Sequence, residues 1–82
     1  MDGSMAADIR EKNVSLRGLK CPLPALKTRK LLSGIPSGGI LVIECTDPLA
    51  AIDIPNLLRE TGDVLEATTR DAELISFRIR KR

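Results

Sequence analysis

The stretch Ile40-Leu41-Val42-Ile43 is the part of the sequence that decides the fold. It is continuously apolar and rich in β-branched side chains, which is typical of a central strand covered on at least one face. It is also far shorter than the ~20 apolar residues that a membrane-spanning helix requires. The stretch therefore predicts a buried strand at the centre of a small, water-soluble domain.

The residues before this strand predict another strand, followed by a helix. Apolar and polar residues alternate over 13–17, the period of a half-buried strand, and Gly18 ends the pattern. A helix is expected over about 22–32, where Ser33-Gly34 supplies a stop signal.

The residues after the central strand predict a second helix that begins at Asp53. A helix that began at Pro48 would place Pro55 in its interior, at a cost of ~3 kcal/mol. With Asp53 as the N-cap, Pro55 falls in the first turn, where its missing N–H is harmless. Gly62 supplies the C-terminal stop. The buried face of this helix is expected to consist of the apolar side chains Ile54, Leu57 and Leu58.

Two strands are expected to complete the chain, over 64–70 and 73–81, with a turn at 71–72. The last strand alternates apolar and polar side chains, so one face of the sheet is expected to be open to water. The predicted fold is α+β with the order β-α-β-α-β-β, a two-layer α/β sandwich in which two helices cover a four-stranded mixed sheet. Residues 13–82 are expected to form this single domain, after a flexible N-terminal tail over 1–12.

Cys21 is the leading candidate for a functional residue, because Pro22 and Pro24 shape the turn around it. A residue before proline is pushed out of the helical region, so Cys21 is expected just outside the helix, near its N-cap. The free N–H groups and the helix dipole are expected to lower the pKa of the thiol below its usual ~8.5. Four nearby cations are expected to act in the same direction: Arg17, Lys20, Lys27 and Lys30. The alternative is a small, buried, structural cysteine.

Leu23 and Leu26 are expected on the solvent side of the first helix, among Lys27 and Lys30. Exposed leucines beside a reactive thiol and cations indicate a docking surface for a partner protein. The alternative is that they are isolated exposed leucines, which are common.

Cys45 ends the central strand and has no helix start of its own, so a buried structural role is expected. If the first two strands are parallel neighbours, however, Cys21 and Cys45 lie at the same edge of the sheet. A disulfide between them would need Cα atoms within about 7 Å. A resolving or protecting role for Cys45 is therefore the alternative.

The composition excludes several kinds of active site. The chain contains no histidine, so Cys-His pairs, Ser-His pairs and histidine metal ligands are impossible. Two distant cysteines cannot complete a four-ligand zinc site, and they are too few for a secreted disulfide scaffold. We therefore expect a cytoplasmic protein with no metal. We also expect a monomer that needs no organic cofactor and has no membrane insertion.

Three motifs occur in order along the chain: Leu16-Arg17-Gly18-Leu19-Lys20-Cys21-Pro22-Leu23-Pro24, Asp47-Pro48 and Asp53-Ile54-Pro55. Together they resemble the TusA/SirA-like family of small sulfur-carrier proteins, over about residues 13–82. The resemblance implies a β-α-β-α-β-β sandwich and a cysteine that accepts persulfide sulfur from a cysteine desulfurase or another donor. It also implies a downstream sulfur-relay protein as a partner, in some members on the way to 2-thiouridine in tRNA. The acceptor role is carried over to Cys21 alone.

The leading interpretation is therefore a sulfur carrier, a sulfurtransferase in the broad sense. Two other classes of function stay open. One is a non-catalytic interaction or regulatory module of the same fold. The other is an RNA-binding module, favoured by a basic ending but opposed by the net charge of only +2 and by Phe77 as the single aromatic residue. The basic ending consists of Arg78, Arg80, Lys81 and Arg82. Direct nucleic-acid binding is not expected.

Overall fold

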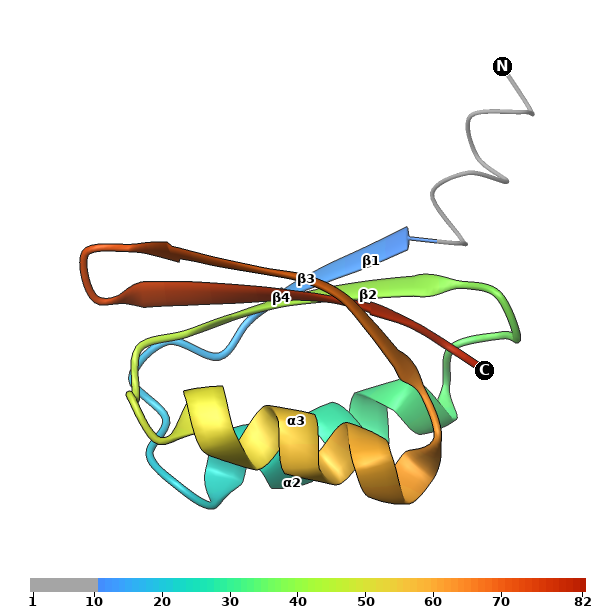
Figure 1. The fold of residues 1–82 in the computed structure, drawn as a ribbon, viewed down its shortest axis with the longest axis horizontal. Coiled ribbons are helices and arrows are strands. Elements are labelled where there is room, and N and C mark those ends of the chain that lie inside the picture. Colours follow the sequence, from blue (N-terminus) through green and yellow to red (C-terminus); the bar gives the residue numbers. More distant parts are fainter. Residues whose placement is uncertain (1–10) are drawn as a thin grey trace.

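A computed structural model describes residues 11–82, which form two layers, a four-stranded sheet on one side and a pair of helices on the other (Figure 1). The predicted α+β class and the order β-α-β-α-β-β are confirmed. The strands are β1 (Glu11–Ser15), β2 (Ile40–Cys45), β3 (Val64–Asp71) and β4 (Leu74–Arg80), and the helices are α2 (Leu23–Ser33) and α3 (Ala50–Thr61). In this part of the chain, neither helix is long and apolar enough to cross a membrane.

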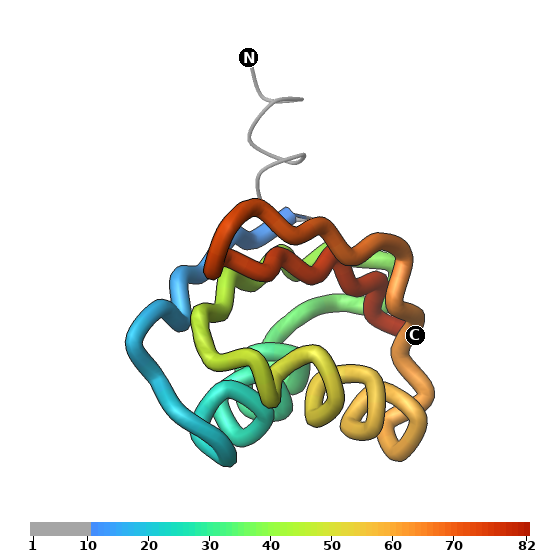
Figure 2. The backbone as a smooth tube through the Cα atoms, turned by 60° about the vertical axis from the view of Figure 1, so that its left-hand side comes forward, coloured from blue at the N-terminus to red at the C-terminus, as the bar shows by residue number. Residues whose placement is uncertain are grey.

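The strands lie in the order β1-β2-β4-β3, so the apolar run at 40–43 is confirmed as part of a central strand. Strands β1 and β2 are parallel, with Ser15 opposite Glu44, whereas the other two pairs are antiparallel. The C-terminal ends of β1 and β2 therefore share one edge of the sheet. Figure 2 shows the segments that follow these two strands descending side by side to the starts of α2 and α3.

The core lies between the sheet and the helices and is aliphatic apart from Phe77 and Cys45. Alternate residues of β2 and β4 point into it and are almost fully buried: Leu41, Ile43, Cys45, Ile75, Phe77 and Ile79. Leu32 of α2 and Ile54 of α3 pack against them from the helical layer. The alternation predicted for the last strand is thus confirmed, and neither helix of residues 11–82 covers the opposite face of the sheet (Figure 1).

Helix α3 begins at Ala50, three residues before the predicted start at Asp53, and Pro55 lies inside it. The start is set by Asp47, whose carboxylate accepts a hydrogen bond from the N–H of Leu49 at 3.0 Å. The carbonyl of the same residue accepts one from the N–H of Ala50, also at 3.0 Å. Ala50 is 1% exposed and extends the buried stripe of the helix by one turn. This burial and the turn fixed by Asp47 outweigh the hydrogen bond that Pro55 cannot donate.

Other boundaries lie within two residues of their predicted positions. Strand β1 begins at Glu11, inside the segment predicted as a tail, and ends two residues early. Residues 1–10 of that predicted tail lie outside the described residues. The last turn is formed by Ala72-Glu73, one residue later than predicted. Both helices end at their predicted stop signals, Ser33-Gly34 and Gly62.

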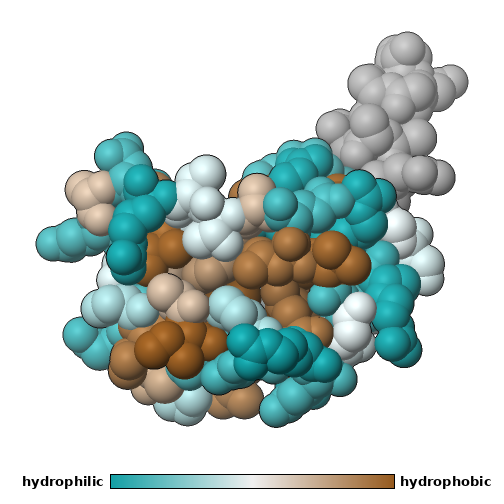
Figure 3. Space-filling view, in the orientation of Figure 1, coloured by the Kyte–Doolittle hydropathy of each residue, from teal (hydrophilic) through white to brown (hydrophobic). Residues whose placement is uncertain are grey.

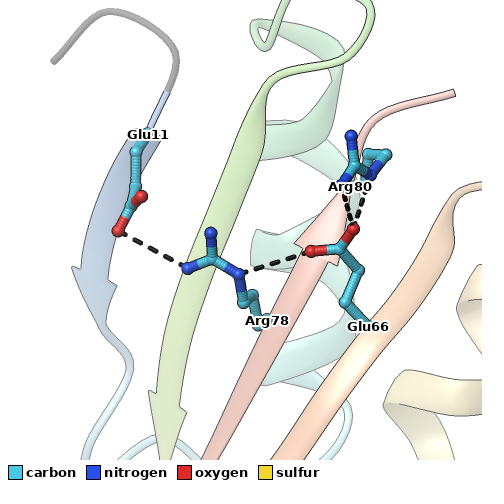
Figure 4. Close-up of polar contacts among 4 residues, drawn as sticks. All are labelled: Glu11, Glu66, Arg78 and Arg80. Carbon is cyan, nitrogen blue, oxygen red and sulfur yellow. Dashed lines mark hydrogen bonds and ion pairs between the residues drawn. The ribbon is translucent and has the colours of Figure 1, made fainter. Parts of the chain in front are cut away.

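The open face of the sheet carries a row of charged side chains (Figure 4). Arg78 of β4 lies 3.6 Å from Glu11 of β1 and 3.3 Å from Glu66 of β3. Arg80 also pairs with Glu66. The row crosses the sheet from one edge strand to the other and holds both arginines in ion pairs.

Candidate functional site

The turn that carries Cys21 connects β1 to α2 at the edge where β2 also ends. Helix α2 begins at Leu23 with Pro22 as its N-cap, so Cys21 lies just outside the helix, as predicted. The N–H of Leu23 donates to the carbonyl of Lys20 at 2.8 Å and closes the turn. The peptide bond between Cys21 and Pro22 is cis. The thiol is free and the residue is exposed, so the alternative of a buried Cys21 is wrong.

Asp47 fixes the backbone of this turn. Its carboxylate accepts a hydrogen bond from the N–H of Cys21 at 2.6 Å, in addition to the one from Leu49. The hydrogen bond from Cys21 is the main reason that the pKa of Asp47 is lowered, and the Leu49 hydrogen bond and the charge of Lys20 also contribute. One carboxylate therefore joins the cysteine turn to the start of α3.

Asp53, in the first turn of α3, contacts the sulfur itself. The thiol of Cys21 donates a hydrogen bond to Oδ2 of Asp53, with 2.7 Å between sulfur and oxygen. This hydrogen bond is the largest cause of a raised pKa of Cys21, and desolvation and the charges of Asp53 and Asp47 act in the same direction. The predicted lowering of the pKa is therefore wrong. The hydrogen bond to Asp53 stabilises the protonated thiol, and two nearby carboxylates oppose the thiolate.

The four cations expected to act on Cys21 do not set the pKa of its thiol. Arg17 forms an ion pair with Glu44 of the neighbouring strand at 3.2 Å. The charge of Lys20 acts on the carboxylate that holds the turn. Lys27 and Lys30 are exposed on α2.

A groove of about 290 Å³ opens beside Cys21, between α2 and α3. Leu26 and Asp53 line it together with the cysteine. Further along, an ion pair between Arg29 of α2 and Glu60 of α3, at 2.7 Å, bridges the two helices. The sulfur thus lies at one end of a groove that runs along the helical layer.

Exposed apolar side chains gather at the end of the helical layer that holds the cysteine. Leu23 and Leu26 are 45% and 56% exposed, as predicted. Sequence reasoning missed Leu49 and Ile52, which are 50% and 59% exposed at the start of α3. Figure 3 shows apolar surface over this part of α3. The sequence prediction began α3 at Asp53, so it placed Leu49 and Ile52 before the helix and did not recognise them as exposed apolar residues at its start.

Cys45 has the buried structural placement that the sequence predicts. Its side chain is 0% exposed and belongs to the hydrophobic core. Burial, with a smaller effect from the charge of Asp47, raises the pKa of Cys45 to about 11. Both cysteines are free thiols. Within residues 11–82, no cluster of three acidic or cysteine side chains could hold a metal ion.

Comparisons with known proteins converge on one family of small proteins. The family model described as "Sulfurtransferase TusA" matches residues 12–81. The chain is 31% identical over 71 residues to "Sulfur carrier protein TusA" of Allochromatium vinosum, a match that covers 87% of this chain and 93% of the relative. It is also 31% identical over 71 residues to "Putative sulfur carrier protein YrkI" of Bacillus subtilis, which covers 87% of this chain and 95% of the relative.

Proposed function

Because this chain belongs to the TusA sulfurtransferase family, we propose that it is a sulfur carrier that accepts persulfide sulfur on Cys21 and relays it to an acceptor protein. The observation that carries the proposal is the exposed, free thiol of Cys21 at the end of a groove between two helices. A carrier must present its sulfur to two partners in turn. A cysteine in a turn at the end of the fold is accessible to both.

The transfer requires only nucleophilic exchange between sulfur atoms. The thiolate of Cys21 attacks the terminal sulfur of the donor's persulfide, so the S–S bond of the donor breaks as a new one forms on Cys21. The thiolate that leaves from the donor takes up the proton that Cys21 gives up. A second exchange of the same kind passes the sulfur on, and the scheme uses no metal and no organic cofactor.

The proposed donor is a cysteine desulfurase or another protein that carries a persulfide. The proposed acceptor is a downstream sulfur-relay protein, with synthesis of 2-thiouridine in tRNA as the first pathway to test and other sulfur pathways as alternatives. Such an exchange suits a cytoplasmic monomer, because thiols stay reduced in the cytoplasm.

The direct test is the mass of the intact protein after incubation with cysteine and a desulfurase. The wild type should gain the mass of one sulfur atom, and a reductant should remove it. Cys21→Ala should abolish the gain, and the matched variant Cys45→Ala should keep it. Loss of the gain in Cys45→Ala alone would assign the acceptor role to the wrong cysteine.

The proposed docking face is formed by exposed side chains at the start of α2: Leu23, Leu26, Lys27 and Lys30. Leu49 and Ile52 extend its apolar part to α3. Charges at the rim of an interface mainly raise the rate of association. Reversal of Lys27 and Lys30 to Glu should therefore slow transfer from the donor protein by about ten-fold, without unfolding. Transfer from a small persulfide should be unchanged, and equal rates with the donor protein would contradict the docking face.

The alternative interpretations keep the fold and assign no sulfur chemistry to Cys21. An RNA-binding module would use the basic ending, yet Arg78 and Arg80 are ion-paired with carboxylates of the sheet (Figure 4). Lys81 donates to a carbonyl of α2 at 2.9 Å. No contact among the described residues favours this reading. Either module would leave the mass of the protein unchanged in the desulfurase experiment.

A further inference from the structure

Among residues 11–82, the two carboxylates nearest to the sulfur have no ion-pair partner. None of the ion pairs within residues 11–82 includes Asp47 or Asp53. Arg29 lines the same groove, but it is paired with Glu60. The sulfur of Cys21 therefore lies in a locally negative site, although the chain as a whole carries a net charge of +2.

We propose that Asp53 positions the sulfur of Cys21 in opposite ways before and after sulfur is loaded. In the unloaded protein its carboxylate accepts the hydrogen bond of the thiol and holds the sulfur against α3. In the loaded protein the same carboxylate repels the persulfide anion and turns the terminal sulfur outward, toward an acceptor. This role rests on the proposed sulfur-carrier function.

The reversal follows from the fate of one proton. A thiol can donate a hydrogen bond to a carboxylate, whereas an anionic sulfur can only repel it. A persulfide is a stronger acid than the corresponding thiol. The loaded group is therefore anionic at a pH at which the thiol of Cys21 keeps its proton, which the hydrogen bond to Asp53 favours.

The loading step removes this proton in a balanced reaction. The thiol of Cys21 and the persulfide anion of the donor give the persulfide anion of Cys21 and the thiol of the donor. One S–S bond breaks, one forms, and one proton passes from Cys21 to the sulfur of the donor. The charge is the same on both sides, and no oxidant or reductant is needed. Loading thus removes the hydrogen on which the contact with Asp53 depends.

The charged groups around the sulfur come from every segment that packs near it: Lys20 of the turn, Arg29 of α2, Asp47 of the loop after β2, and Asp53 and Glu60 of α3. Asp53 contacts the sulfur, and Asp47 adds a second negative charge beside it. Arg29 and Glu60 neutralise each other further along the groove. A persulfide anion is therefore favoured on the exposed side of Cys21, away from α3.

The first measurement follows the unloaded thiol. Asp53→Asn keeps the size of the side chain and removes its charge, and Glu60→Gln is the matched control that removes a carboxylate from the same groove. Alkylation of the folded proteins by iodoacetamide is measured over a series of pH values. Asp53→Asn should move the midpoint to lower pH and speed alkylation several-fold at neutral pH. Glu60→Gln should stay within about two-fold of the wild type, because its charge lies further from the sulfur.

The second measurement follows the loaded sulfur. The proteins are loaded with inorganic polysulfide, and release of the terminal sulfur to a small thiol is timed. Asp53→Asn should release it several-fold more slowly, because the neutral side chain no longer turns the persulfide outward. Opposite changes in the two assays support the proposal, since a purely structural role would not produce them. Changes of the same sign, or no change, overturn it.

The two proposals can fail separately. If the wild type takes up no sulfur from a desulfurase or from polysulfide, the carrier function fails and the loaded-state role of Asp53 fails with it. If the wild type loads but Asp53→Asn leaves the alkylation profile unchanged, the carrier function stands and the role of Asp53 is wrong. Asp53→Ala, checked for folding by circular dichroism, repeats both measurements without an amide that could form a new hydrogen bond.

Discussion

The two cysteines belong to segments at the same edge of the sheet, yet their thiols keep their protons for different reasons. Cys45 ends β2, is fully buried, and has a pKa raised to about 11, mainly by burial. Cys21 follows β1 by a turn, is exposed, and has a pKa raised mainly by the hydrogen bond to Asp53. A change at one neighbouring side chain can therefore release the proton of Cys21, whereas release at Cys45 requires opening of the core.

The direction of a pKa shift does not by itself separate a functional cysteine from a structural one. Both thiols are shifted upward, but only the shift of Cys21 has a side-chain partner as its main cause. A shift caused by a partner can be reversed when the partner moves or the sulfur is modified. A shift caused by burial lasts as long as the fold does.

The largest expected difference between the two cysteines is in their rate of alkylation. In the native protein, iodoacetamide should modify Cys21 at least about 100-fold faster than Cys45, because a buried group reacts only after an opening that costs several kcal/mol. Peptide mass mapping over a time course distinguishes the two sites. In strong denaturant the rates should converge, which provides the control. Native rates that differ by less than about ten-fold would mean that the end of β2 opens easily.

The next effect is a dependence of stability on pH that comes from Cys45. Its pKa is higher in the folded protein, about 11, than the ~8.5 of an unfolded thiol, so the folded state keeps the proton longer. The resulting stability is fully present below ~8.5 and is lost as the pH rises toward about 11. Over this range the free energy of unfolding should fall by about 3 kcal/mol more in the wild type than in Cys45→Ala.

Urea unfolding at a series of pH values measures this difference. Lysines titrate in the same range, so only the change in slope between variants is informative. Cys21→Ala is the matched control. It should reduce the decline less than Cys45→Ala does, because Cys21 is exposed and solvent screens the groups that raise its pKa. Equal slopes for the wild type and Cys45→Ala would contradict the burial of Cys45 as the cause.

Most of the fold could be predicted because its elements carry strong local patterns. The apolar run at 40–43 and the alternation of Ile75, Phe77 and Ile79 each indicate which face is buried. The start of α3 could not be predicted from its proline. The turn fixed by Asp47 before the helix and the burial of Ala50 outweigh the local penalty of Pro55, and the burial depends on tertiary packing.

The position of the candidate site could be predicted from the sequence, but its chemistry could be predicted only in part. The prolines place Cys21 outside the helix, a local effect. Asp47 and Asp53 lie 26 and 32 residues further along the chain, and they reach the cysteine only because β1 and β2 are parallel neighbours. The cations are close in sequence but act elsewhere, as the ion pair of Arg17 with Glu44 shows. The sequence did contain a signal for Asp47 and Asp53. Both follow β2, and the end of β2 shares an edge of the sheet with Cys21.

The smallest expected effect concerns Thr28, which is buried on the core side of α2 just as Cys45 is buried at the end of β2. A thiol bonds weakly and tolerates burial, whereas the hydroxyl of Thr28 has no hydrogen-bond partner among the described residues. Since an unsatisfied buried hydroxyl costs about 1–3 kcal/mol, Thr28→Val should raise the free energy of unfolding by about 1 kcal/mol. Thr28→Ala is the control and should lower it, because it leaves a cavity. Urea unfolding at neutral pH measures both variants, and a loss of stability in Thr28→Val would mean that the hydroxyl bonds to a carbonyl of α2 or to a buried water.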